Sequence, residues 1–192
     1  MRAELNFLSD TPALPRLLAF SGSARRDSLN KKLLANVVEA TRAAGVDVTV
    51  VDFRELPLPL YDGDLEAAGG LPDNAKKLIE LITQHHGVLV ASPEYNSMLT
   101  PLLRNAFDWC TRADENSLIG KTAAVVSASP GMLGGLRSMT RARQLLLHLG
   151  CHLVPVQCIL PQADKAFRCR GKTNPERGHR NRSGMSPPLW SR

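Results

Sequence analysis

No apolar run in this 192-residue chain approaches the ~20 residues that a membrane-spanning helix needs. The first 15 residues carry two acidic side chains and no long apolar segment, so we do not expect a secretory signal there. Neither a C-x-x-C pair nor a metal-ligand spacing is formed by the four cysteines, which are Cys110, Cys151, Cys158 and Cys169. We therefore predict free thiols, a cytoplasmic protein, no membrane partner and no metal site.

Two common phosphate-binding motifs are also missing. The chain contains no G-x-x-x-x-G-K-[ST], the loop that cradles nucleoside triphosphates. It contains no G-x-G-x-x-G either, which argues against a dinucleotide pyrophosphate as the natural ligand. Any phosphate site in this chain must therefore be built from other residues.

The chain has no net charge outside one terminal segment. Residues 168–192 hold seven Lys or Arg and one acidic residue, which accounts for the whole net charge of +6. The first 167 residues hold seventeen basic and seventeen acidic side chains. Because the tail has one aromatic residue and no recognisable module, we expect no nucleic-acid partner.

The pattern around residues 17–38 predicts a strand, a short polar loop and a helix. Leu17 to Phe20 is a short apolar run, Ser21-Gly22-Ser23 stops it, and a helical pattern follows from Leu29. This order aims the free N–H groups and the dipole of the helix start at a ligand above the strand, which favours an anion. The polar side chains that could bind a terminal phosphate here are Ser23, Arg25, Ser28 and Asn30. The alternative is that Ser23 and Ser28 are only turn and N-cap residues.

Strands and helices alternate in short steps along the rest of the chain. We expect further strands at 46–51, 87–91, 122–127 and 152–159, and helices near 71–84, 100–111 and 136–149. Residues 52–70 are read as a long connection rich in Pro, Asp and Gly. The alternation predicts an α/β fold with a parallel sheet, in which ligands bind beyond the carboxyl ends of the strands.

Three polar loops fall at such strand ends. They are Ser21-Gly-Ser-x-Arg25-x-x-Ser28-x-Asn30, Pro93-Glu94-Tyr95-Asn96 with the helix that runs to Trp109, and Ser129-Pro130-Gly131-x-x-Gly134-Gly135-x-Arg137. Together and in this order they resemble the NAD(P)H-dependent FMN reductase family, which includes flavodoxin-like quinone, chromate and azo reductases. The resemblance covers about residues 16–166. It implies a flavodoxin-like, doubly wound sheet of five parallel strands in the order 2-1-3-4-5.

The resemblance also implies cofactor contacts. The FMN phosphate would lie at the first loop, which contributes Ser23, Ala24, Arg25, Ser28, Leu29 and Asn30. The isoalloxazine and ribityl would lie along Pro93, Glu94, Tyr95 and Asn96. The other side of the ring system would face Ala128, Ser129, Pro130 and Gly131. No side chain is expected to act as a catalytic acid or base, because the cofactor carries the chemistry.

The implied activity is transfer of hydride from NADPH or NADH to bound FMN, and then to a small-molecule acceptor. The acceptor could be a quinone, an azo compound, a metal oxyanion or free flavin, and relatives are commonly dimers or tetramers. A non-enzymatic flavodoxin-type electron carrier is the alternative. Such carriers are usually strongly acidic, whereas residues 1–167 are neutral.

The expected organisation has three parts: an N-terminal extension over 1–15, an FMN-binding domain over 16–167, and a basic tail over 168–192. The tail holds three prolines and few large apolar residues, so its composition predicts disorder. These residues cannot supply the helix that should cover the sheet after the fifth strand, so the last helix is expected to be missing. Composition and charge change together at Phe167. We therefore hypothesise that a reading-frame slip replaced the native last helix.

Overall fold

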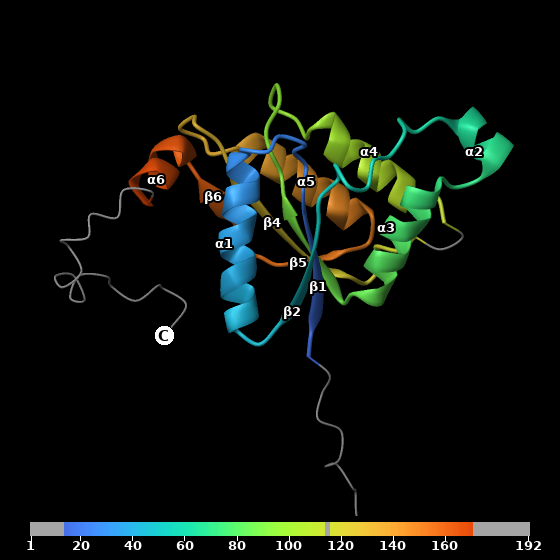
Figure 1. Cartoon of the computed structure of the whole chain (residues 1–192), viewed down its shortest axis with the longest axis horizontal. Coiled ribbons are helices and arrows are strands. Elements are labelled where there is room, and N and C mark those ends of the chain that lie inside the picture. The colour runs from blue at the N-terminus through green and yellow to red at the C-terminus, as the bar shows by residue number, and fades with distance from the viewer. Residues whose placement is uncertain (1–13, 114–115, 171–192) are drawn as a thin grey trace, which may run out of the picture.

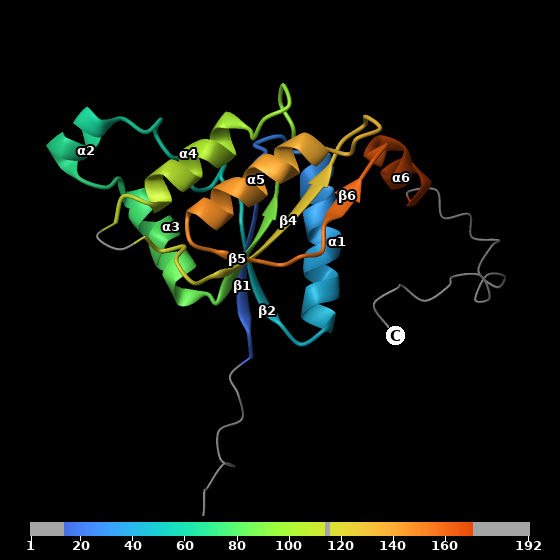
Figure 2. The same cartoon turned by 180° about the vertical axis from the view of Figure 1, so that it is seen from behind.

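The computed structural model describes residues 14–113 and 116–170. A parallel sheet forms the middle layer, with α1 in front of it in Figure 1 and with α4 and α5 in front of it in the reverse view of Figure 2. The strands are β1 (Arg16–Ser21), β2 (Asp47–Val51), β3 (Gly87–Ala91), β4 (Thr122–Ala128), β5 (His152–Leu153) and β6 (Cys158–Leu160). The helices are α1 (Leu29–Ala43), α2 (Gly63–Gly69), α3 (Asp73–Gln84), α4 (Pro101–Cys110), α5 (Leu136–His148) and α6 (Ala163–Arg170).

The sheet order is β2-β1-β3-β4-β5, and every pairing is parallel, which confirms the predicted flavodoxin-like topology. β1 lies between β2 and β3, and its Phe20 stands opposite Val51 on one side and Val90 on the other. The loops that follow β1, β3 and β4 all leave the sheet at its carboxyl edge, at the top of Figure 1.

The predicted fifth strand is split into two short pieces. β5 pairs with the start of β4 and β6 pairs with its end, so both occupy the fifth position of the sheet. Leu153 and Cys158 are five positions apart in the sequence, whereas their partners in β4, Ala123 and Val126, are only three apart. The segment between β5 and β6 is therefore longer than the stretch of β4 that it runs beside. Pro155 lies in the excess segment, and because proline has no N–H it cannot donate to a ladder.

The two faces of the sheet bury separate apolar clusters, because alternate strand residues point to opposite faces. Phe20 packs with α3, α4 and α5, and its ring lies edge-on to that of Phe107 with centroids 6.1 Å apart. Ala19 packs on the other face with Leu34 and Val38 of α1. Cys110, Cys151 and Cys158 are free thiols, as predicted.

Two helices differ from the sequence expectations. α2 lies inside the segment read as a connection, where Asp62 Oδ1 accepts from the Asp64 N–H at 2.9 Å and caps the helix. α2 buries none of its residues and lies away from the sheet, so its sequence has no apolar periodicity from which a helix could be predicted.

The prediction that residues 168–192 supply no helix after the fifth strand is contradicted over residues 168–170, which end α6. α6 continues three residues past the expected boundary at Phe167. Ala163 and Phe167, one turn apart, pack on the α1 side of the sheet, and Arg168 pairs with Asp164 at 2.8 Å. Residues 171–192, on which the frame-slip hypothesis depends, lie outside the described residues.

Among residues 14–113 and 116–170, no helix combines the length and hydropathy that crossing a bilayer requires. The same residues contain no group of three His, Cys, Asp or Glu side chains placed to hold a metal ion.

Candidate active site

The loop after β1 presents two buried hydroxyls at the start of α1. Ser28 is the N-cap, and its Oγ accepts from the Lys31 N–H at 3.4 Å. Ser23 is also buried, and its Oγ accepts from the Arg25 N–H at 3.3 Å. Because each Oγ accepts in these contacts, its own hydrogen is left to donate to a ligand. Arg25 and Ala24 are exposed and Leu29 is half-buried.

This loop is fixed by the end of β3 and the start of α4. The Gly22 N–H donates to Ala91 O at 2.9 Å, and Thr100 Oγ1 donates to Gly22 O at 2.6 Å. A Cβ at position 22 would come within 2.8 Å of Leu103 Cβ, so only glycine permits this approach of loop and helix. Thr100, the N-cap of α4, was not anticipated as part of the site.

Asn30 joins the first loop to the end of β4. Its Nδ2 donates to Ala128 O at 2.8 Å, and its Oδ1 accepts from the Ala128 N–H at 3.0 Å. Both residues are buried. These two bonds hold the first loop against the end of β4, and one Nδ2 hydrogen of Asn30 remains free to donate to a ligand.

The loop after β3 ends in a tight hairpin. Tyr95 and Met98 exchange two backbone hydrogen bonds of 3.0 and 3.1 Å, and Asn96 and Ser97 form the turn with φ of 53° and 65°. A left-handed backbone is unfavourable for serine, and such strain is typically held at functional sites. Tyr95 and Met98 are 46% and 52% exposed, and the hairpin stands above the carboxyl edge in Figure 1.

Glu94 connects this loop to α5. Its Oε2 accepts from the N–H groups of Arg137 at 3.0 Å and Ser138 at 3.2 Å, in the first turn of the helix. The N-cap residue Gly135 has no side chain that could cap the helix. The Glu94 carboxylate from the loop after β3 caps it instead, and its negative charge interacts favourably with the helix dipole. Ser138 Oγ adds a bond to Pro93 O at 2.8 Å.

The loop after β4 is held by the last two elements. The Ser129 N–H donates to Leu160 O at 3.2 Å, and the Ala163 N–H donates to Ser129 O at 3.0 Å. Ser129 Oγ accepts from the Gly131 N–H at 3.1 Å and closes the turn across Pro130. Pro130 and Gly131 are exposed. β6 and α6 therefore support this loop, a role that no local sequence pattern signals.

We expect Gly135→Ala to lower the free energy of unfolding by about 2–5 kcal/mol. Gly135 has φ of 88°, and a Cβ there would lie 1.9 Å from Ser127 Oγ, which donates to Ser92 O at 2.7 Å. Gly45→Ala is the matched control, because Gly45 has φ of 83° with nothing within 4 Å of the added Cβ. Urea denaturation of both variants tests the prediction, and equal losses would contradict it.

A family model decides which class this arrangement belongs to. Residues 15–165 match the model of the NADPH-dependent FMN reductase family. The chain belongs to this family. The match spans all three loops at the carboxyl edge, and it makes the chain an NAD(P)H-dependent FMN or quinone reductase-like enzyme.

Individual relatives are similar over most of the chain. An NAD(P)H-dependent FMN reductase of Pseudomonas aeruginosa is 32% identical over 158 residues, which cover 82% of this chain and 83% of that protein. A quinone reductase of Escherichia coli K12 is 31% identical over 137 residues, 70% of each chain. An NADPH:quinone oxidoreductase of Arabidopsis thaliana is 35% identical over 143 residues, which cover 73% and 71%.

Solved structures show the same architecture. FerB of Paracoccus denitrificans, a flavoenzyme NAD(P)H:acceptor oxidoreductase, superimposes with a TM-score of 0.67 at 29% identity, covering 80% of this chain and 91% of that one. An azoreductase from Bacillus anthracis gives a TM-score of 0.57 at 13% identity, covering 81% and 90%. The second likeness concerns the fold alone.

The residues of this FMN reductase family member fit the cofactor that the family uses. Ser23 and Ser28 are buried hydroxyls with hydrogens left to donate, and they lie beside the N-terminus of a fifteen-residue helix. Arg25 is exposed beside them and can bind a phosphate with a charged fork. This donor set suits a terminal monophosphate, which FMN carries.

Proposed function

We propose that this chain binds FMN across the loops after β1, β3 and β4, and reduces a small-molecule acceptor with NADPH or NADH. The observation that carries the proposal is that the three loops are tied to one another. Asn30 bonds the backbone of Ala128 on both sides, and Glu94 bonds the first turn of α5, which follows the third loop. Because these bonds fix the three loops relative to one another, the loops are preorganised to bind a rigid cofactor.

Each loop has a distinct role in this proposal. Ser23, Ser28 and Arg25 hold the phosphate at the start of α1, and residues 93–96 and 128–131 line the ring system. Bound FMN would supply the hydride and electron transfer between nicotinamide and acceptor. Backbone N–H groups beside the ring would stabilise negative charge on it. No side chain of the described residues is assigned an acid or base role.

The loops after β3 and β4 suit a flat apolar acceptor such as a quinone. Tyr95 and Met98 of the hairpin are exposed, and so are Leu133 and Leu136 of the following loop and helix. Glu94 holds these two segments together through α5. Exposed apolar side chains on adjacent loops favour an aromatic or quinonoid partner over a hydrophilic oxyanion.

The assay for this proposal is consumption of NADPH by the purified chain with FMN and menadione, with no other protein added. We expect steady loss of NADPH absorbance that requires both FMN and chain. A non-enzymatic electron carrier would consume no NADPH without a separate reductase, so that outcome would contradict the proposal. Menadione, an azo dye, chromate and free flavin compared side by side rank the acceptor classes.

A further inference from the structure

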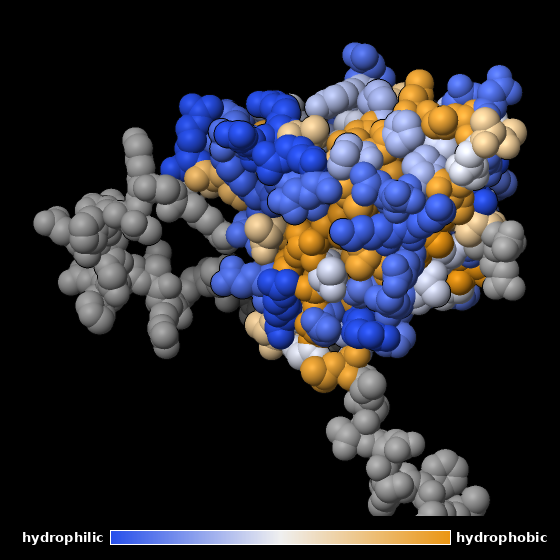
Figure 3. All heavy atoms as spheres, turned by 45° about the vertical axis from the view of Figure 1, so that its right-hand side comes forward, coloured by the Kyte–Doolittle hydropathy of each residue, from blue (hydrophilic) through white to orange (hydrophobic). Residues whose placement is uncertain are grey.

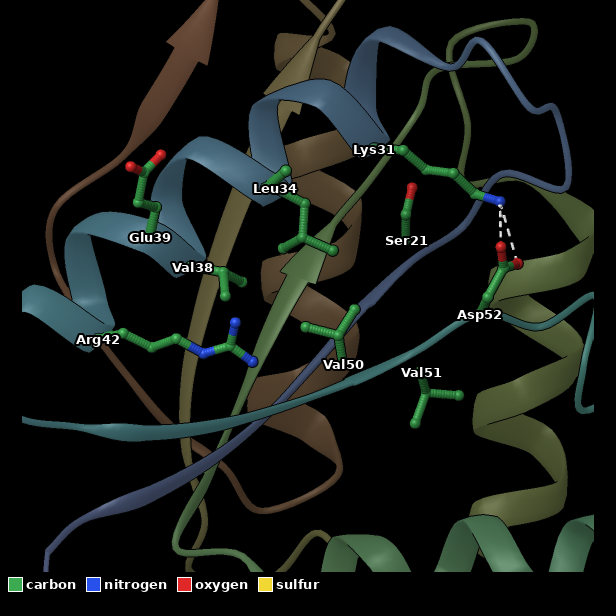
Figure 4. A pocket seen from close by; sticks show the side chains of 10 residues that line it. Ser21, Lys31, Leu34, Val38, Glu39, Arg42, Val50, Val51 and Asp52 are labelled. Carbon is green, nitrogen blue, oxygen red and sulfur yellow. Dashed lines mark hydrogen bonds and ion pairs between the residues drawn. The ribbon is translucent and has the colours of Figure 1, made fainter.

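A second concave site lies away from the three loops. A groove of about 360 Å³ runs between α1 and β2, within the range of ~300–1,000 Å³ typical of small-molecule sites. Figure 4 shows side chains from α1 and β2 facing each other across it. Its walls are apolar in the middle, and the side chains that form them are Leu34, Ala35, Val38 and Val50. None of the fourteen residues predicted to bind FMN lines this groove.

The groove is open because β2 is the edge strand of the sheet. Val48 is covered by α1 at the start of β2, whereas Val50, two residues on and on the same face, is 53% exposed. Figure 3 shows hydrophobic side chains reaching the surface between hydrophilic ones on the side of the molecule it presents. An exposed valine beside an apolar hollow is a feature that a bound apolar molecule would cover.

Ser21 supplies an unpaired polar atom at one end of the groove. The residue is 4% exposed, and its Oγ has no hydrogen-bond partner among the residues that the structure describes. Figure 4 shows the side chain near Lys31, at the end of the groove where β1 ends. A buried hydroxyl without a partner is unfavourable, so a ligand oxygen that pairs with it would gain affinity.

Four of the residues that line the groove are charged. Lys31 Nζ contacts both oxygens of Asp52 at 2.8 and 3.0 Å, and Arg54 binds the same carboxylate. Hydrogen bonds from Arg54, and then from Lys31, hold the pKa of Asp52 well below its usual range, so this partner stays ionised. Arg42 and Glu39 line the other end. Among the residues that line the groove, Lys31 and Arg42 balance Glu39 and Asp52, so the lining itself has no net charge and suits an uncharged ligand.

We propose that this groove is a second ligand site, for a small, uncharged, largely apolar molecule with one hydroxyl or carbonyl oxygen. The apolar part lies against Leu34, Val38 and Val50, and the oxygen pairs with Ser21. Ser21 ends β1 and Lys31 lies in the first turn of α1, so the polar end of the groove lies where β1 gives way to α1. The proposal does not depend on FMN binding.

The test uses 4-ethylphenol and ethylbenzene, which differ by one hydroxyl, titrated into the full chain and followed by amide NMR. We expect saturable shifts along α1 and β2, with millimolar affinity for the phenol and about three- to tenfold weaker affinity for ethylbenzene. Ser21→Ala should abolish this difference. It should not lower the melting temperature, because it removes an unpartnered hydroxyl.

Blocking variants give the second arm of the test. Val50→Trp and Ala35→Trp fill the groove from opposite walls and should weaken 4-ethylphenol by at least about tenfold, whereas Val156→Trp, at an exposed position outside the groove, should not. No saturable shift, shifts confined to the three loops, or an unchanged preference in Ser21→Ala would overturn the proposal. If Val50→Trp converts an oligomer to a monomer, a second copy covers the groove and the proposal is wrong.

Discussion

Arg25→Ala is expected to weaken FMN binding by about ten- to a hundredfold. Arg25 is exposed on the loop that carries the buried hydroxyls of Ser23 and Ser28, where a guanidinium can bind a phosphate with two hydrogen bonds. A charge-assisted hydrogen bond contributes roughly 1.5–3 kcal/mol, and each 1.4 kcal/mol is about tenfold in affinity. Isothermal titration of FMN into both proteins measures the effect.

Two controls separate phosphate binding from a structural role. Arg26→Ala removes a neighbouring exposed arginine, and it should change FMN affinity much less. Riboflavin lacks the phosphate, so it should bind wild type and Arg25→Ala equally. An equal loss of riboflavin and FMN affinity in Arg25→Ala would show that the side chain shapes the loop instead.

Asn30→Ala is expected to lower the free energy of unfolding by about 2–4 kcal/mol. The amide of Asn30 makes two buried hydrogen bonds to the backbone of Ala128, at 2.8 and 3.0 Å. Alanine leaves the Ala128 N–H and C=O unpaired in the interior, where neither can bond to water. Chemical denaturation followed by circular dichroism measures the loss.

Asn36→Ala is the matched control, because Asn36 lies in the same helix and is only partly buried. It should change stability by less than about 0.5 kcal/mol. We also expect Asn30→Ala to weaken FMN, since it releases the first loop from the third. A stable Asn30→Ala protein with wild-type FMN affinity would contradict the positioning role.

Local patterns predicted most of the fold. The apolar run from Leu17 to Phe20 and the helical spacing after Leu29 correspond to β1 and α1. The sheet order, which the family resemblance implied, is the one observed. These elements are buried on continuous stretches, so composition and periodicity report them directly. α2 buries no side chain and is held by its cap and its acidic first turn, so periodicity could not reveal it.

The tertiary parts of the site could not be predicted in the same way. Asn30 and Glu94 were identified as site residues, yet the bonds that engage them reach residues 98 and 43 or 44 positions away. Thr100 and Ser138 carry no motif and enter the site only because helices bring them to strand ends. The groove beside β2 depends on where α1 crosses the sheet, which no local pattern specifies.

FMN retention tests the central claim most directly, because that claim is that the loops after β1, β3 and β4 form one FMN site. The purified chain is incubated with FMN, desalted, and its visible spectrum recorded before and after anaerobic addition of NADPH. We expect an equimolar amount of FMN to remain with the protein and its absorbance to bleach on addition of NADPH. A folded but colourless protein after desalting, with no FMN binding by calorimetry, would contradict the account.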